Sequence, residues 1–265
     1  MCGNARIEAD LQHLMGKAVA DVVFADPPYN VRIDGHVGGK GKIKHREFSE
    51  ASGEMSTAEF QNFLSSTLAN ASSFTRAGSV HYICMDWRQS AVLSSVGSEA
   101  IGPQINLCVW VKTNGGMGSL YRSQHELVLV FAKAGATHRN NVQLGRFGRN
   151  RTNVWHYAGV NTFREGRMDE LRAHPTAKPV AMVKDALLDV TRRGDNVLDP
   201  FGGAGATLMA AERSGRCARL LEIDPAYVDV MLRRWHAETG EDPVRVIDGV
   251  SLSSLEAEAE RRVRK

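Results

Sequence analysis

Short apolar runs alternate with segments of helical periodicity along most of the chain. The run at 20–25 (ADVVFA) stops at two prolines and predicts a buried strand. Comparable runs predict further strands at 80–84, 107–111, 127–132, 196–199, 218–223 and 244–247. Apolar residues at helical spacing predict helices at 57–75, 88–100, 179–191, 206–214 and 226–239. Strands that alternate with helices predict an α/β fold with a mostly parallel sheet covered on both faces.

Three segments lack this periodicity. Residues 31–55 are rich in Gly, Lys and His and predict a long loop, and residues 134–173 are basic and poor in apolar residues. The charged tail from 256 to 265 predicts a frayed end.

Composition limits the class of protein. A chain of 265 residues with 43% hydrophobic residues fits one large α/β domain. No apolar run approaches the ~20 residues of a membrane span, and the N-terminus lacks a signal-like apolar core, so we expect no membrane and a cytoplasmic location. The four cysteines show no CxxC spacing, which argues against a metal site or a disulfide framework.

Positive charge is concentrated in two places, although the whole chain carries only +3. Residues 133–173 hold eight basic and three acidic side chains, a net charge of +5, and a second basic cluster lies at 40–46. Such patches indicate a polyanionic partner, with a solvated loop as the plainer alternative. The candidate contacts are Lys42, Lys44, Arg46, Arg139, Arg146, Arg149 and Arg151.

A glycine turn follows the strand at 196–199, in the sequence DPFGGAGAT that starts at Asp199. Glycines here let a ligand approach the backbone closely. The next predicted strand ends at Glu222 and Asp224, where a carboxylate can bind both hydroxyls of an adenosine ribose. Together these features indicate an adenosine-containing cofactor, without indicating which one.

A second motif, Asp26-Pro27-Pro28-Tyr29, directly follows the first predicted strand. An exocyclic amino group of a base is a poor nucleophile because its lone pair is delocalised into the ring. A carboxylate and a proline-adjacent carbonyl that accept its two N–H groups can direct that lone pair at a methyl donor, and the prolines make the turn rigid. The tyrosine offers a face on which a base can stack, once the base has left the duplex.

The two motifs resemble the catalytic and cofactor motifs of amino-group DNA methyltransferases, and their order resembles the permuted beta class. Other matches occur in the expected places: HPTAKP at 174–179, WVK at 110–112 and SQHELVLVF at 123–131. The resemblance therefore covers nearly the whole chain. It implies a circularly permuted, Rossmann-like sheet of seven strands, S-adenosylmethionine as cofactor, and methylation of adenine N6 in duplex DNA after base flipping.

The resemblance also implies roles for individual residues and a division of the single domain. Asp26, Pro27, Pro28 and Tyr29 match the clamp for the target amine. The matches to the cofactor site are Asp199, Pro200, Phe201, Gly202, Gly203, Gly205, Glu222 and Asp224, with Thr176 and Lys178 near the cofactor's methionine end. Residues 1–133 match the catalytic half, 134–173 a small inserted target recognition region, and 174–265 the cofactor half.

Alternatives remain at this stage. An NAD-dependent dehydrogenase shares the glycine turn but leaves Asp26 to Tyr29 unexplained. Within methyl transfer, the target can be N4 of cytosine, an RNA base or a protein amide instead. A non-catalytic DNA-binding module has no need of Asp26. A homodimer is possible by resemblance, and no segment of the sequence predicts its interface.

Overall fold

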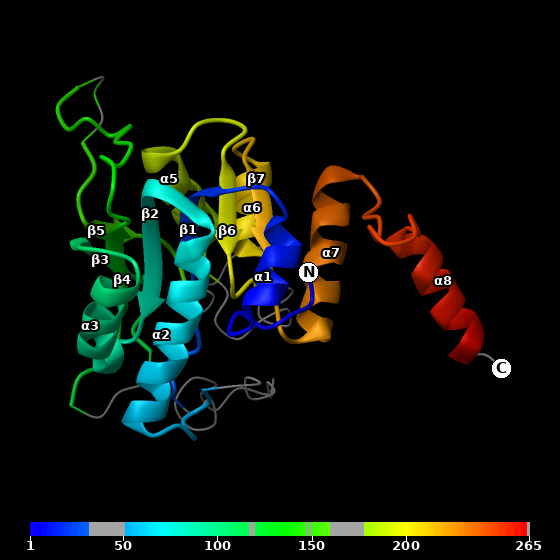
Figure 1. Ribbon diagram of the computed structural model, residues 1–265, viewed down its shortest axis with the longest axis horizontal. Helices are drawn as coiled ribbons and strands as arrows, with labels where there is room; N and C mark the ends of the chain where they lie inside the picture. The colour runs from blue at the N-terminus through cyan, green and yellow to red at the C-terminus, as the bar shows by residue number, and fades with distance from the viewer. Residues whose placement is uncertain (32–50, 117–119, 147, 149, 160–177, 264–265) are drawn as a thin grey trace.

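A seven-stranded sheet forms the centre of the molecule (Figure 1). The computed structural model describes residues 1–31, 51–116, 120–146, 148, 150–159 and 178–263. The strands, in the order in which they lie side by side, are β5 (Val154–His156), β3 (Gln104–Val111), β4 (His125–Ala132), β2 (Thr75–Met85), β1 (Ala20–Ala25), β6 (Asn196–Asp199) and β7 (Cys217–Leu220).

All neighbouring strands run parallel except at β4, which is antiparallel to both β2 and β3. The predicted α/β fold with a mostly parallel, seven-stranded sheet is therefore confirmed. From β1 the chain proceeds toward β2, whereas from β6 it proceeds toward β7 on the other side. The sheet thus has its topological switch point between β1 and β6, where ligands bind in open α/β sheets.

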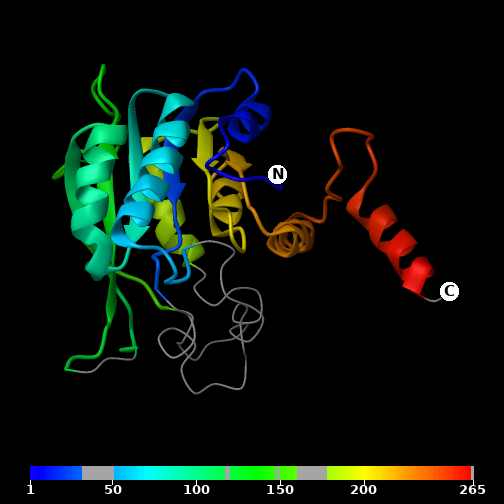
Figure 2. The same ribbon diagram turned by 60° about the horizontal axis from the view of Figure 1, so that its bottom comes forward.

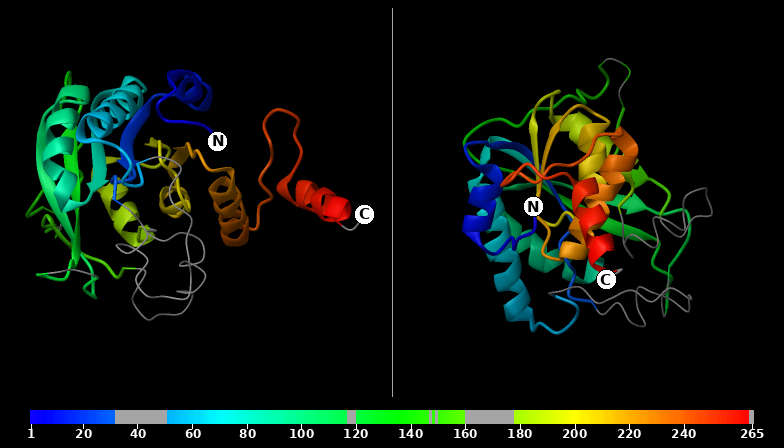
Figure 3. Two further views of the ribbon diagram at one scale, coloured as in Figure 1. Left: turned by 90° about the horizontal axis from the view of Figure 1, so that it is seen from below. Right: turned by 90° about the vertical axis from the view of Figure 1, so that its right-hand side faces the viewer.

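Helices cover both faces of the sheet (Figure 3). On one face α1 (Glu8–Met15), α2 (Thr57–Ser73) and α3 (Ser90–Ala100) bury apolar side chains against the strands, and a short 3₁₀ turn, η1 (Trp87–Gln89), precedes α3. On the other face lie α5 (Val180–Val190) and α6 (Ala206–Glu212). The α2 helix begins at the predicted capping box, in which Ser56 and Glu59 bond reciprocally.

The chain after β7 departs from the sequence-based expectation. The helix α7 (Pro225–Thr239) is present, but the strand predicted at 244–247 is wrong. Val246 and Ile247 are 101% and 88% exposed, because this short run packs against no sheet face. The tail is helical, not frayed: α8 (Leu252–Val263) extends away from the body of the molecule (Figure 1).

Two further elements, α1 and β5, were also missing from the prediction. The helix α1 is short and covers one edge of the core through Leu11 and Met15. The strand β5 lies inside the segment expected to recognise the target, and it joins the sheet beside β3. None of the helices in the described ranges combines the length and apolar character that a bilayer crossing requires. Cytoplasmic location and homodimerisation stay predictions.

Candidate active site

The candidate site lies where β1 and β6 end, at the switch point of the sheet (Figure 2). Val23 of β1 pairs with Leu198 of β6, so Asp26, just after β1, and Asp199, the last residue of β6, reach the same edge. The two motifs are 173 positions apart in sequence and meet here because the strands that carry them are neighbours. The sheet therefore places the predicted amine clamp beside the predicted cofactor turn.

Both carboxylate oxygens of Asp26 have a partner. The Tyr29 hydroxyl donates to Asp26 Oδ1 over 2.6 Å, and Lys178 Nζ donates to Asp26 Oδ2 over 2.5 Å. The Lys178 side chain is 4% exposed and the Asp26 side chain is 21% exposed. Because an ionised carboxylate offers about four lone pairs, each oxygen of Asp26 can still accept a further N–H.

Glu126 completes this network from β4, the strand beyond β2. Its Oε2 lies 3.1 Å from the Tyr29 hydroxyl and 3.2 Å from Lys178 Nζ, and its Oε1 accepts from Lys112 Nζ over 2.5 Å. Two ammonium groups and two carboxylates therefore balance one another's charge. Glu126 and Lys112 lie in two of the matched motifs, but no role was predicted for either residue. Both flank the connection between two predicted strands, and the antiparallel direction of β4 is what brings them to this edge.

Lys178 makes contacts that the resemblance did not indicate. The resemblance implied a contact near the methionine end of a cofactor, which stays a prediction, and the structure places the ammonium between Asp26 and Glu126. Thr176, the other residue expected at that end, lies outside the described residues.

Burial and charge act against each other on these side chains. Burial raises the pKa of Asp26 above its ordinary value, and the ammonium of Lys178 acts in the opposite direction. The pKa of Glu126 is lowered to about 2, because the attraction of Lys178 and Lys112 outweighs its burial. The pKa of Tyr29 is raised well above its usual range by burial and by the nearby carboxylates, so its hydroxyl keeps its proton and donates.

Asn30 fixes the end of the Asp26–Tyr29 turn, a role that the sequence analysis missed. It adopts a left-handed backbone conformation with φ of 54°. Its side-chain oxygen accepts from the backbone N–H groups of Gly53 and Met55, and its amide donates to the Met55 carbonyl over 2.7 Å. The turn is therefore tied to the residues that lead into α2.

Two buried carboxylates lie at the ends of β6 and β7. Asp199 accepts from the Phe201 backbone N–H over 2.9 Å, and burial raises its pKa to about 7. Glu222 accepts from the backbone N–H groups of Gly203 and Asp224 over 2.8 and 2.9 Å, and burial raises its pKa. These backbone bonds hold Glu222 in one position at the end of β7.

Two glycines of the turn have a packing reason beyond ligand approach. A Cβ at Gly202 would lie 3.1 Å from the sulfur of Met231, and a Cβ at Gly205 would lie 2.9 Å from the Met231 Cγ, with φ of +79° at Gly205. Met231 is the buried residue of α7. Glycine is therefore needed at Gly205, where φ is positive and the contact is too short, while Gly202 allows α7 to pack closely against the turn. Pro200 is buried beside them.

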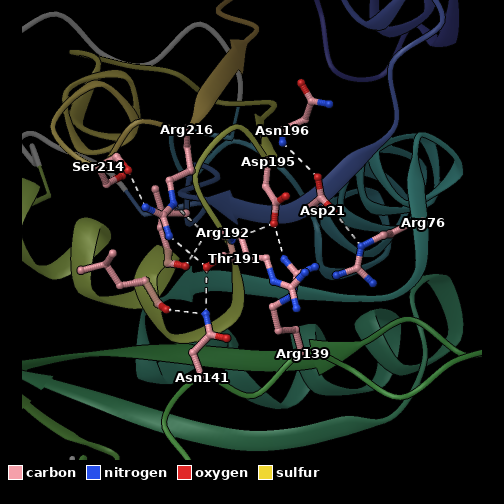
Figure 4. A network of polar contacts seen from close by, with 12 residues as sticks. Asp21, Arg76, Arg139, Asn141, Thr191, Arg192, Asp195, Asn196, Ser214 and Arg216 are labelled. Atoms are coloured by element: carbon pink, nitrogen blue, oxygen red, sulfur yellow. Dashed lines mark hydrogen bonds and ion pairs between the residues drawn. The ribbon is translucent and has the colours of Figure 1, made fainter.

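Two of the basic residues expected to contact DNA are bound to the scaffold instead. Arg139 pairs with Asp195, which precedes β6 at the end of the sheet opposite the site (Figure 4). The Arg151 Nε lies 2.6 Å from Asp189 of α5, and its guanidinium lies over the Trp155 ring. The clustering of positive charge in the sequence did not indicate where Arg139 or Arg151 lies, because charge alone does not show which end of the sheet a segment covers.

The described residues between 134 and 159 consequently make more contacts with the sheet and with α5 than expected. Asn141 donates to the carbonyls of Leu188 and Thr191 at the C-terminal end of α5, and β5 joins the sheet. Arg146 is exposed. The remaining basic candidates, Lys42, Lys44, Arg46 and Arg149, lie outside the described residues, as do residues 160–173.

Comparison with known proteins fits this geometry. The chain is 24% identical over 252 residues to the type II methyltransferase M.HpaI of Haemophilus parainfluenzae, which covers 90% of this chain and 74% of that protein. It is 27% identical over 253 residues to the DNA adenine methyltransferase YhdJ of Escherichia coli K12, covering 85% and 79% of the two chains.

Solved structures share the fold at low identity. The crystal structure of an M1.HpyAVI–SAM complex matches with a TM-score of 0.64 at 18% identity, over 88% of this chain and 97% of that chain. The cytosine-N4-specific PvuII DNA methyltransferase matches with a TM-score of 0.64 at 15% identity, over 88% and 84%. A family model for N6- and N4-acting enzymes, described as DNA methylase, matches residues 20–233. The chain belongs to this N6/N4 DNA methylase family.

Proposed function

We propose that this DNA methyltransferase transfers a methyl group from S-adenosylmethionine to N6 of an adenine that has been flipped out of duplex DNA. The observation that carries the proposal is the position of Asp26. Its carboxylate is fixed by Tyr29 and Lys178 at the edge where the glycine turn of β6 also ends. A hydrogen-bond acceptor held this way beside a cofactor site suits the orientation of an amine.

The residues of the cofactor half suit an adenosine-bearing methyl donor. Glu222 is held by two backbone N–H groups at the end of the strand next to β6, and its remaining lone pairs suit ribose hydroxyls. Phe201 is half-buried against Phe63, with ring centroids 6.0 Å apart, and offers an apolar surface. When bound, S-adenosylmethionine supplies an electrophilic methyl group on a sulfonium.

The side chains at the end of β1 then orient the target. Asp26 accepts one N–H of the amine and the backbone of the Pro27–Pro28 turn accepts the other, which directs the nitrogen lone pair away from the ring. Lys178 favours the ionised form of Asp26 despite its burial. Tyr29 is held by Asp26 and Glu126, so its ring is fixed as a surface on which a base can stack.

Adenine N6 is proposed over cytosine N4 on the form of the motif. Asp26 provides the aspartate form, which by family resemblance favours adenine, and YhdJ is named a DNA adenine methyltransferase. The same fold also serves the PvuII enzyme, which is cytosine-N4-specific. The chemistry at the clamp is the same for both amines, so product analysis decides between them.

The test is to incubate the purified protein with unmethylated genomic DNA and labelled S-adenosylmethionine, and to identify the methylated nucleoside by mass spectrometry. We expect N6-methyladenine at a fixed sequence. The Asp26→Ala variant should lose methyl transfer while its calorimetric cofactor affinity stays close to wild type. Asp26→Asn should keep part of the activity, because an amide oxygen still accepts the hydrogen bond.

The outcomes separate the parts of the proposal. N4-methylcytosine in the digest would change the target base and leave the clamp standing. An Asp26→Ala variant with wild-type activity would remove the clamp assignment. Methyl transfer to RNA or to a protein amide, with none to DNA, would overturn the proposed substrate.

A further inference from the structure

The connection between β3 and β4 carries two highly exposed apolar side chains beside the active site. Leu120 is 82% exposed and Tyr121 is 84% exposed. Figure 2 shows this connection extending beyond the sheet at the edge where β1 ends. Large side chains that are exposed together at a functional edge indicate a binding surface, and this one requires a partner that accepts an apolar projection.

The base of this hairpin is joined directly to the catalytic network. Lys112 follows β3 and Glu126 lies near the start of β4, and the two side chains bond to each other. Glu126 in turn contacts Tyr29 and Lys178. The antiparallel direction of β4 is what brings the hairpin to this edge, because a parallel strand would begin at the opposite one.

The neck of the hairpin is cross-linked by hydrogen bonds. The backbone N–H of Lys112 donates to the Gln124 carbonyl over 2.8 Å, and the Gln124 side chain returns a bond to the Lys112 carbonyl. The Arg122 guanidinium donates to the carbonyls of Gly115 and Gly116 over 2.8 and 3.0 Å. Leu120 and Tyr121 therefore project from a hairpin whose base is fixed by hydrogen bonds.

Charge and reach both fit duplex DNA as the partner. Residues 112–124 contain Lys112 and Arg122 and no acidic residue. Tyr121 precedes Glu126 by five positions. At about 3.3 Å per residue, Tyr121 therefore lies within ~17 Å of Glu126 and the side chains that contact it. A flipped base bridges a gap of this order, since it stays attached to the backbone while it leaves the stack.

We propose that Leu120 and Tyr121 form an apolar wedge that inserts into duplex DNA beside the target base and stabilises its flipped-out state. The wedge rests on the proposed function, because it presupposes a flipped base at Asp26. Apolar side chains that enter a base step replace part of the stacking lost when a base leaves. The wedge therefore acts on base opening, separately from the chemistry at the clamp.

The test compares Leu120→Ala, Tyr121→Ala and the double variant with the wild-type enzyme in single-turnover methylation. The first substrate is an unmethylated duplex that contains the sequence identified by the product analysis. The second is the same duplex with an abasic site opposite the target base. A base without a partner costs less to flip. We expect the double variant to be about tenfold or more slower on the paired duplex, and within about twofold of wild type on the abasic one.

The control variant is Val19→Ala, which truncates an exposed apolar side chain directly before β1, at the end of the sheet opposite the site. It should match wild type on both substrates. Equal rates for the double variant and wild type on the paired duplex would overturn the wedge, as would an equal loss on both substrates. Wild-type enzyme that methylates neither duplex would instead refute the proposed function.

Discussion

Lys178 Nζ lies 2.5 Å from Asp26 Oδ2, although the two residues are 152 positions apart in the chain. Asp26 belongs to the turn after β1, and Lys178 to the segment that enters α5. The contact therefore joins the segment after β1 to the segment before α5 at the group that is proposed to orient the target amine. The pKa of Asp26 therefore depends on a side chain that is distant in sequence.

Replacing Lys178 should change the pH dependence of methyl transfer. The Lys178 ammonium lowers the pKa of Asp26 against the effect of burial, so Lys178→Met removes the largest influence that opposes burial and the pKa of Asp26 rises. Activity requires the ionised carboxylate, and the acidic limb of the single-turnover pH–rate profile should move to higher pH. The exposed Lys17→Met is the control. An unshifted acidic limb with an unchanged maximal rate would contradict this role.

Asp199 should make the fold less stable as the pH rises. Burial raises its pKa from 3.8 to about 7, so between these values the native state keeps a proton that the unfolded chain has released. Its contribution to stability is therefore full below pH 3.8 and is lost as the pH rises through 7. The Asp199→Asn variant cannot ionise, and its stability relative to wild type should grow by roughly 2–3 kcal/mol between pH 5 and pH 8.

Urea unfolding of both proteins at the two pH values measures this difference. Because Asn keeps an oxygen that can accept from the Phe201 N–H, the comparison isolates the charge. A difference between variant and wild type that is the same at both pH values would show that Asp199 does not titrate in this window.

Glu222→Ala should weaken the binding of S-adenosylmethionine by about tenfold or more, since a hydrogen bond to a charged group contributes roughly 1.5–3 kcal/mol. The substitution also leaves the N–H groups of Gly203 and Asp224 without their acceptor. Isothermal titration calorimetry provides the measurement, and Glu99→Ala, at an exposed position of α3, is the matched control. Unchanged affinity in Glu222→Ala would reduce Glu222 to a cap for the glycine turn.

Arg151 and Arg146 should respond differently to substitution, although both were expected to contact DNA. Arg151→Ala removes one partner of the pair with Asp189, whose side chain is 8% exposed, and should lower the free energy of unfolding by up to about 3 kcal/mol. Arg146 is exposed, so Arg146→Ala should stay within about 0.5 kcal/mol of wild type. Chemical denaturation checks both values, and equal stabilities would refute the scaffold role of Arg151.

The sequence carried enough information for the two motifs and for most of the sheet. Asp26 and Asp199 each end an apolar run, and parallel strands end at one edge, so the strand pattern places both at the same edge, while their proximity depends on β1 and β6 being neighbours. Glu126 could not be placed this way, because its position depends on the direction of β4. The ion pair of Arg139 with Asp195 was not predictable for a related reason: its charge is evident in the sequence, but its end of the sheet is a tertiary property.

The pairing of β1 with β6 has a consequence for how the chain is made. Val22 of β1 is translated 175 residues before its partner Val197. At about 5–20 residues per second, the ribosome takes roughly 9–35 s to supply that partner. During this interval one edge of a predominantly apolar central strand has no permanent neighbour. We therefore expect the nascent catalytic half to depend on chaperones until the second half emerges.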